Sequence, residues 1–138
     1  MNRVIVYSDD PAVRNDVRRG IGIDPGGSLS AIEWVDCGTG AEVISDIDTG
    51  GVDLVILDGE AWPTGGMGLA RQLKDEIDDC PPTLLLIARR DDAWLAKWSL
   101  ADAVVPFPLD TAVLAGAVTE LLHGREQGLP VRRHVRFE

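Results

Sequence analysis

The sequence predicts an α/β domain in which five β-strands alternate with five helices. Short runs rich in apolar and β-branched residues recur along the 138 residues, and a helical pattern follows each run. Two of the runs, 52–57 and 83–88, are apolar at nearly every position, which is typical of central strands in a parallel sheet covered by helices on both faces. Such a strand–helix repeat folds as one sheet with right-handed crossovers.

The first third of the chain contains two predicted strands and the helix between them. The first strand is predicted at Arg3–Tyr7. Asp10 is a suitable helix N-cap and Pro11 a suitable first helical residue. A glycine-rich stretch over 20–27 is expected to end this helix. The second strand is predicted at Leu29–Val35 because it is again rich in β-branched and aromatic residues.

The middle third repeats the pattern. Thr39 and Glu42 have the spacing of a capping box, which predicts a second helix that ends near Gly50–Gly51. The third strand is predicted at Val52–Leu57. A flexible, glycine-rich turn follows, and the third helix is predicted at Leu69–Ile77.

The last third adds two more strand–helix units. The fourth strand is predicted at Thr83–Ala88, and an aspartate at position 91 or 92 is expected to cap the fourth helix. Ala103–Val105 is predicted as the fifth strand. Asp110 is expected to cap the last helix and Gly124 to end it.

The charge pattern separates an acidic body from a basic end. The formal net charge is −10, which disfavours nucleic acid and anionic membranes as partners. Residues 124–138 nevertheless hold four arginines against two glutamates. We therefore expect a domain over residues 1–124 and a basic C-terminal tail over 125–138, with no output domain.

The sequence favours a cytoplasmic location. No apolar stretch approaches the roughly 20 residues of a membrane-spanning helix, so direct membrane insertion is not expected. The chain starts with a strand rather than with a signal-peptide pattern. Cys37 and Cys80 lack metal or redox spacing and are expected to be buried free thiols.

Two predicted strands lead into acidic residues. Ser8, Asp9 and Asp10 follow the first strand, and Asp58 follows the third. Sites in parallel α/β sheets form where the carboxyl ends of strands meet. If these strands are neighbours, Asp9 and Asp58 face each other. A divalent cation such as Mg²⁺, which binds one or two carboxylates, a carbonyl oxygen and water, would relieve their repulsion.

Four segments, VIVYSDDPAVR, LVILD, TLLLIA and VVPFP, resemble the receiver domain of bacterial two-component response regulators. The resemblance extends over about residues 3–123. It implies a flavodoxin-like three-layer sandwich with strand order 2-1-3-4-5. It also implies that a histidine kinase transfers a phosphoryl group to an aspartate at the end of the third strand, beside an acidic pair that binds Mg²⁺.

The resemblance places Asp58 at the phosphoacceptor position and Asp9 at that of a direct metal ligand. Glu60 falls where the family offers a backbone carbonyl, so Asp9, Asp58 and Glu60 are the predicted metal set. Ser8 replaces the first acid of the pair and brings no negative charge. Weak Mg²⁺ binding is one prediction, and the alternative is that the acids cap backbone N–H groups or are solvated. No cofactor is expected to be required.

Two later positions depart further from the family. Ala88 stands where the family has a Ser or Thr, and Phe107 where it has a lysine before Pro108. Both missing groups would bind phosphoryl oxygens, and phosphoryl transfer depends on such positioning and charge neutralisation. The sequence thus predicts a stand-alone pseudo-receiver, not an enzyme, that acts through protein contact without phosphorylation switching. The alternative is a single-domain response regulator phosphorylated on Asp58.

Tryptophans are the first candidate docking residues. Trp94 and Trp98 lie four residues apart on the predicted fourth helix. They either pack on the sheet or bind a partner, since tryptophan is enriched at binding hot spots. Trp34, on the predicted edge strand, and Trp62, in the loop after the third strand, would suit docking if exposed. We expect a protein partner or larger protein complex, and a monomer or weak dimer.

The basic tail is the second candidate docking element. Such a tail is either disordered or an arm that binds a partner's groove or a sheet edge. Its alternating apolar and basic residues fit an extended strand. The tail residues expected to contact a partner are Arg132, Arg133, Arg136 and Phe137.

Overall fold

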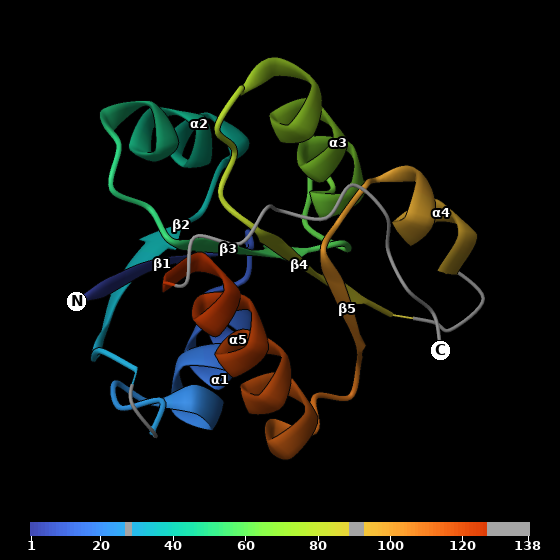
Figure 1. Ribbon diagram of the computed structural model, residues 1–138. Helices are drawn as coiled ribbons and strands as arrows, with labels where there is room; N and C mark the ends of the chain where they lie inside the picture. Colours follow the sequence, from blue (N-terminus) through green and yellow to red (C-terminus); the bar gives the residue numbers. More distant parts are fainter. Residues whose placement is uncertain (27–28, 89–92, 127–138) are drawn as a thin grey trace.

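The computed structural model describes residues 1–26, 29–88 and 93–126, which form one five-stranded parallel sheet with five helices (Figure 1). The strand order is β2-β1-β3-β4-β5, so the predicted fold class and strand order are confirmed. The strands are β1 (Asn2–Tyr7), β2 (Ile32–Cys37), β3 (Leu54–Asp58), β4 (Thr83–Ile87) and β5 (Ala103–Pro106). The helices are α1 (Pro11–Ile21), α2 (Gly40–Thr49), α3 (Gly66–Glu76), α4 (Ala93–Trp98) and α5 (Thr111–Glu126).

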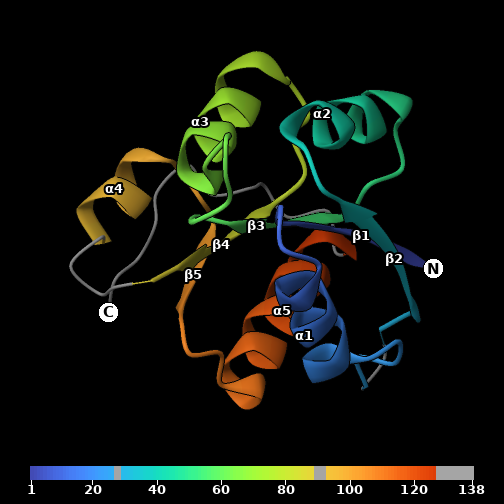
Figure 2. The ribbon, with the colours of Figure 1, turned by 180° about the vertical axis from the view of Figure 1, so that it is seen from behind.

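Helices cover both faces of the sheet and produce three layers. α2, α3 and α4 lie on one face, and α1 and α5 lie on the other (Figure 1, and from behind in Figure 2). Alternate residues of β1 serve the two cores. Ile5 and Tyr7 belong to the core beneath α2 and α3, whereas Val4 and Val6 belong to the core against α1 and α5. Every residue of β3 is buried, as expected for a central strand.

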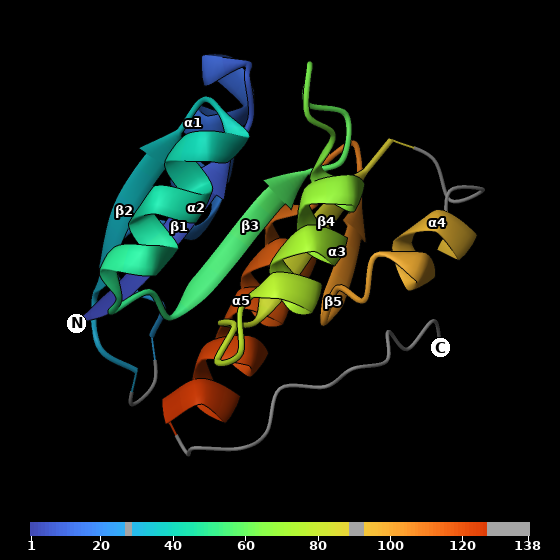
Figure 3. The same ribbon diagram turned by 90° about the horizontal axis from the view of Figure 1, so that it is seen from above.

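The central strands bring their carboxyl ends to one edge of the sheet. β1 pairs with β3 so that Tyr7 lies opposite Leu57. β3 extends one residue beyond its predicted end, and Asp58 lies opposite Leu86 of β4. Because all strands run in the same direction (Figure 3), Asp58 lies in the middle of this carboxyl edge.

Three predicted helix starts are confirmed by their capping hydrogen bonds. Asp10 Oδ1 accepts the N–H of Ala12 at 2.9 Å. Thr39 Oγ1 accepts the N–H of Glu42 at 3.2 Å. Asp110 Oδ1 accepts the N–H two residues further on at 2.9 Å. Each side chain thereby satisfies an N–H group that the first turn of a helix leaves without a backbone partner.

Two predicted boundaries are wrong because local patterns do not show backbone pairing. The second strand is Ile32–Cys37 rather than Leu29–Val35, since its register follows the full length of β1. α3 begins at Gly66 rather than at Leu69, and the N–H of Leu69 already bonds to the carbonyl of Gly65.

The predicted end of the last helix, at Gly124, is also wrong. α5 continues through Gly124 to Glu126, because Gly124 does not adopt the left-handed conformation with which a glycine ends a helix. Arg125 Nη1, in this extra turn, lies 3.9 Å from Asp79 Oδ1. The predicted cap at position 91 or 92 lies outside the described residues.

A buried ion pair joins elements at the opposite, amino edge of the sheet. Lys74 Nζ in α3 lies 2.7 Å from Asp102 Oδ2, and only 1% and 2% of the two side chains are exposed. The N–H of Thr83, at the start of β4, donates to the same oxygen at 2.8 Å. Burial raises the pKa of Asp102 above its ordinary value, against the attraction of Lys74. No local pattern predicts this pair, because its members lie 28 positions apart.

Candidate functional site

The candidate site lies at the carboxyl edge, where β1 and β3 end side by side (Figure 3). β1 continues into Ser8 and Asp9, and β3 ends on Asp58. Only 4% of Asp58 is exposed. Its carboxylate must therefore find hydrogen-bond donors within the protein.

Two donors of the chain hold the Asp58 carboxylate. The Ser8 hydroxyl donates to Oδ2 at 2.8 Å, and the backbone N–H of Glu60 donates to Oδ1 at 2.9 Å. Ser8 is itself fully buried, and its oxygen accepts the N–H of Asp10 at 3.0 Å. A hydrogen bond to a charged group contributes about 1.5–3 kcal/mol, so these two bonds account for a carboxylate at an almost closed edge.

Asp9 holds the loop between β3 and α3. Its Oδ1 accepts the backbone N–H of Trp62 at 3.0 Å. In the same loop, the carbonyl of Thr64 accepts the hydroxyl of Tyr7. Burial, together with the carboxylates of Asp9 and Asp58, raises the pKa of Tyr7, so this hydroxyl keeps its proton. The loop is thus fastened to the end of β1 at two points.

Close backbone contacts explain the glycines at the two ends of this loop. A Cβ atom on Gly59 would lie 2.6 Å from the carbonyl oxygen of Leu86. A Cβ atom on Gly66 would lie 2.5 Å from the carbonyl oxygen of Asp58. The turn predicted to be flexible is therefore fastened by hydrogen bonds to Tyr7 and Asp9 and packed tightly at its two glycine ends, whereas residues 62–64 between them are exposed.

Positions 88 and 107 bring no polar side chain to the carboxyl edge. Ala88 directly follows β4 and is exposed. Phe107 follows β5, is half-buried, and packs against the core beside α1 and α5. Its N–H donates to the carbonyl of Ile87 at 2.8 Å, and the Phe107–Pro108 bond is cis. Neither side chain can donate a hydrogen bond or carry a charge.

Asp9 and Asp58 of the predicted metal set are engaged by hydrogen-bond donors of the chain. Over residues 1–26, 29–88 and 93–126, no group of three or more His, Cys, Asp or Glu side chains is placed to share a metal ion. Both oxygens of Asp58 accept donors of the chain, and Asp9 accepts the N–H of Trp62. A cation bound by the two carboxylates and the Glu60 carbonyl would share the carboxylate oxygens with these donors.

Arg14 is a site neighbour that the sequence patterns do not single out. Its Nη1 donates to the carbonyl of Ser8, and its Nε lies 3.4 Å from Asp36 Oδ2. Arg18, one turn further along α1, also pairs with Asp36, at 3.4 Å. These contacts fasten the segment after β1 to the end of β2. In the sequence, the only signal for these contacts is the spacing of the two arginines, which lie one helical turn apart.

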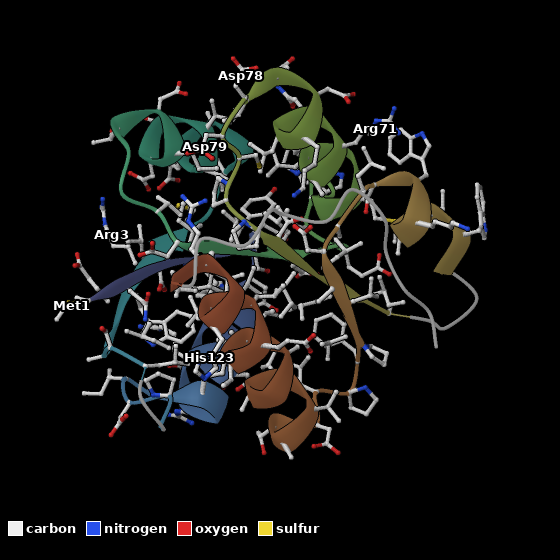
Figure 4. All side chains as sticks on the ribbon, viewed as in Figure 1. Met1, Arg3, Arg71, Asp78, Asp79 and His123 are labelled. Carbon is white, nitrogen blue, oxygen red and sulfur yellow. The ribbon has the colours of Figure 1, made fainter. Side chains whose placement is uncertain are left out.

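Two of the tryptophans form an exposed aromatic surface. Trp94 is 69% exposed and Trp98 is 49% exposed, so they do not pack on the sheet. The guanidinium of Arg71, on the outer side of α3 (Figure 4), lies over the Trp98 ring at 5.5 Å from its centroid. We call Arg71, Trp94 and Trp98 the α3–α4 surface.

The other two tryptophans differ in exposure. Trp34, on β2, is half-buried, and its indole N–H donates to the carbonyl of Gly22 at 2.8 Å. It therefore connects the end of α1 to the edge strand instead of being free for docking. Trp62 is 75% exposed at the carboxyl edge.

The remaining predicted residues carry less information. Arg132, Arg133, Arg136 and Phe137 lie outside the described residues. Cys37 and Cys80 are buried free cysteines, as predicted. Burial and a hydrogen bond to Asp46 raise the pKa of Cys37 to about 12, so this thiol is unreactive. No helix in the described part of the chain is long and apolar enough to cross a membrane.

Comparison with known proteins identifies the class to which this fold and edge belong. No family model matches the sequence. Over 120 residues the chain is 52% identical to the uncharacterized response regulatory proteins of two Mycobacterium tuberculosis strains, CDC 1551 and H37Rv. The match covers 87% of this chain and 90% of each relative. The chain therefore belongs to the receiver domains of bacterial two-component response regulators.

Solved receiver domains share the fold. A response regulator receiver domain protein from Clostridium thermocellum superposes with a TM-score of 0.75 at 19% identity, over 94% of this chain and 100% of that one. The response regulator TrrA from Thermotoga maritima, solved in complex with Mg²⁺–BeF, superposes with a TM-score of 0.72 at 26% identity. That match covers 88% of this chain and 100% of TrrA.

Proposed function

We propose that this receiver domain is a pseudo-receiver, a protein-binding regulatory module that works without phosphorylation switching and catalyses no reaction of its own. The observation that carries the proposal is the state of Asp58. Its carboxylate is almost fully buried, and both oxygens accept hydrogen bonds from the chain. Held by these two donors, the Asp58 carboxylate serves the structure as a hydrogen-bond acceptor and not as a nucleophile.

The chemistry of phosphoryl transfer supports the same proposal. A transferred phosphoryl group needs positive charge and hydrogen-bond donors placed around its oxygens. Ala88 and Phe107 supply neither, and the half-buried Phe107 packs against the core beside α1 and α5. A phosphoryl group on Asp58 would therefore gain few contacts that differ between two states. A switch requires such differential contacts.

Divalent cations have a minor place in this proposal. The domain requires no resident cation, and Mg²⁺ at Asp9, Asp58 and the Glu60 carbonyl binds weakly at most. The ion would have to share the carboxylate oxygens with the Ser8 hydroxyl and with the backbone donors that already bind them.

A protein, or a larger protein complex, is the proposed partner. Trp94 and Trp98 expose large apolar surface, and the charge of Arg71 lies over the Trp98 ring, a composition enriched at binding hot spots. The net charge of −10 disfavours nucleic acid. The proposed unit is the receiver domain, whose boundary moves from residue 124 to the end of α5 at Glu126, acting as a monomer or weak dimer, with the basic C-terminal segment as a second contact.

Phosphorylation can be tested directly. The wild-type domain and the Asp58→Asn variant are incubated with acetyl phosphate and MgCl₂, beside a receiver domain that accepts phosphate. Intact-mass spectrometry is expected to show an adduct only on the control domain. An adduct on the wild-type chain that Asp58→Asn abolishes would refute the proposal and establish a single-domain phosphoreceiver.

The partner surface has its own test. Tagged wild-type protein, the Trp94→Ala/Trp98→Ala variant and an Ile23→Ala variant are used for affinity capture from the native cell extract. Ile23 is a matched control because it is 70% exposed and belongs to a different part of the surface. A specific protein is expected with wild type and Ile23→Ala and strongly reduced with the double variant. Equal recovery by all three would show that the α3–α4 surface does not bind it.

A further inference from the structure

Three hydrogen-bond donors of the chain converge on the two carboxylates of the carboxyl edge. The Ser8 hydroxyl and the Glu60 N–H bind the two oxygens of Asp58 at 2.8 and 2.9 Å. The Trp62 N–H binds Asp9 at 3.0 Å. A carboxylate otherwise obtains such stabilisation from water or from a cation, and water has little access to Asp58, which is 4% exposed.

The geometry fixes Ser8 as a donor toward Asp58. A hydroxyl has one hydrogen. Because Ser8 Oγ accepts the N–H of Asp10 at 3.0 Å, its own hydrogen is directed to Asp58 Oδ2. Arg14 binds the carbonyl of Ser8, so the backbone of this buried residue is held as well.

We propose that Ser8 is the positioning residue that makes this domain independent of a divalent cation. Its hydroxyl stabilises the Asp58 carboxylate directly, and Asp9 is thereby left to hold the loop of Trp62. The inference rests on the proposed function and names the residue that makes a cation unnecessary at this site.

An acid at position 8 is expected to restore the dependence on a cation. Ser8→Asp removes the donor and places a third carboxylate beside Asp9 and Asp58. Position 8 and Asp58 are buried, so like charges at these two positions repel strongly. A divalent cation relieves this repulsion by binding carboxylate oxygens.

The test is thermal unfolding, followed by circular dichroism, in EDTA and in millimolar MgCl₂. For the wild type, the midpoint temperature is expected to differ by less than about 1 °C between the two conditions. For Ser8→Asp in EDTA, it is expected to fall by at least about 5 °C, which corresponds to losing one or more charged hydrogen bonds. Mg²⁺ is expected to recover most of that loss.

The matched control is Ser8→Asp/Asp58→Asn, which removes one of the three charges and should lose most of the response to Mg²⁺. If Ser8→Asp does not fold in either condition, Ser8→Ala decides, and its midpoint is expected to rise with Mg²⁺ more than that of the wild type. The inference would be overturned if Mg²⁺ raised the midpoint temperature of the wild type by several degrees. It would also be overturned if a folded Ser8 variant had the same midpoint with and without Mg²⁺. Phosphorylation of Asp58 in the wild type would instead refute the proposed function, so the two failures are distinguishable.

Discussion

Replacing Lys74 by methionine isolates one charge in the interior of the domain. Lys74 Nζ lies 2.7 Å from Asp102 Oδ2, and the two side chains are 1% and 2% exposed. Methionine approximates the apolar part of the lysine side chain and removes only the ammonium group. The Asp102 carboxylate is then left without its counter-charge, in a place where its Oδ1 already has no hydrogen-bond partner among the described residues.

The expected cost follows from this burial. Removing one member of a buried ion pair destabilises a protein by about 3–5 kcal/mol, a large part of a typical total of about 5–15 kcal/mol. Burial already raises the pKa of Asp102, and Lys74 opposes that shift. The variant therefore has a still higher pKa at Asp102 in the folded state.

This shift makes the cost depend on pH. Below about pH 4, the ordinary pKa of an aspartate, the folded and unfolded states both carry the proton and the raised pKa has no effect. As pH rises above that value, the unfolded state loses the proton while the folded state keeps it. Stability then falls by up to about 1.4 kcal/mol per pH unit until the folded pKa is passed. Lys74→Met should thus be closest to the wild type in acid.

Urea unfolding followed by tryptophan fluorescence, at about pH 5 and about pH 7.5, measures both effects. The matched control is Lys74→Met/Asp102→Asn, because asparagine removes the charge and keeps an oxygen for the N–H of Thr83, which now donates at 2.8 Å. This double variant should recover most of the loss and show a weaker pH dependence. A cost for Lys74→Met below about 1 kcal/mol, or the same cost at both pH values, would refute the reasoning.

Three further variants or treatments test other parts of the structure. Gly66→Ala places a Cβ 2.5 Å from the carbonyl oxygen of Asp58, so the free energy of unfolding in urea is expected to fall by about 1–3 kcal/mol. The control Gly68→Ala has open space around its Cβ and should cost nothing, and equal effects of the two variants would contradict the packing described. Cys37, with a pKa of about 12, should resist alkylation at about pH 8 until the protein unfolds, and rapid labelling of this residue in the native state would contradict its burial. Trp34→Phe removes the 2.8 Å hydrogen bond from the indole to α1 and should lower stability by about 1 kcal/mol, and an unchanged urea midpoint would show that the bond contributes nothing.

Local sequence patterns were sufficient where the interactions themselves are local. The N-caps Asp10 and Thr39 bond to residues two or three positions away, so their identity and spacing predict the helix starts. The apolar run that ends at Leu57 predicted a central strand, and every residue of β3 is buried. Boundaries that depend on partners elsewhere were not predictable. β2 ends at Cys37 because it pairs along the whole of β1.

The same distinction holds at the candidate site. Parallel strands end at a common edge, so the sequence predicted Ser8, Asp9 and Asp58 at one edge of the sheet provided that the first and third strands are neighbours, and it has no polar side chain at positions 88 and 107. Tertiary structure decided which group each acid contacts. Ser8 donates to Asp58 across 50 positions of sequence, and Asp9 accepts from the loop 53 positions away.

The physical reason is that a hydrogen bond needs two atoms within about 3 Å of each other, and that distance depends on sheet register and on the path of each loop. The pair of Lys74 and Asp102 and the stacking of Arg71 on Trp98 arise in the same way. The sequence by itself determined the layers, the order of the elements and the presence of Ser8, Asp9 and Asp58 at the carboxyl edge. Only the tertiary structure decided that Asp58 is satisfied by the chain's own donors.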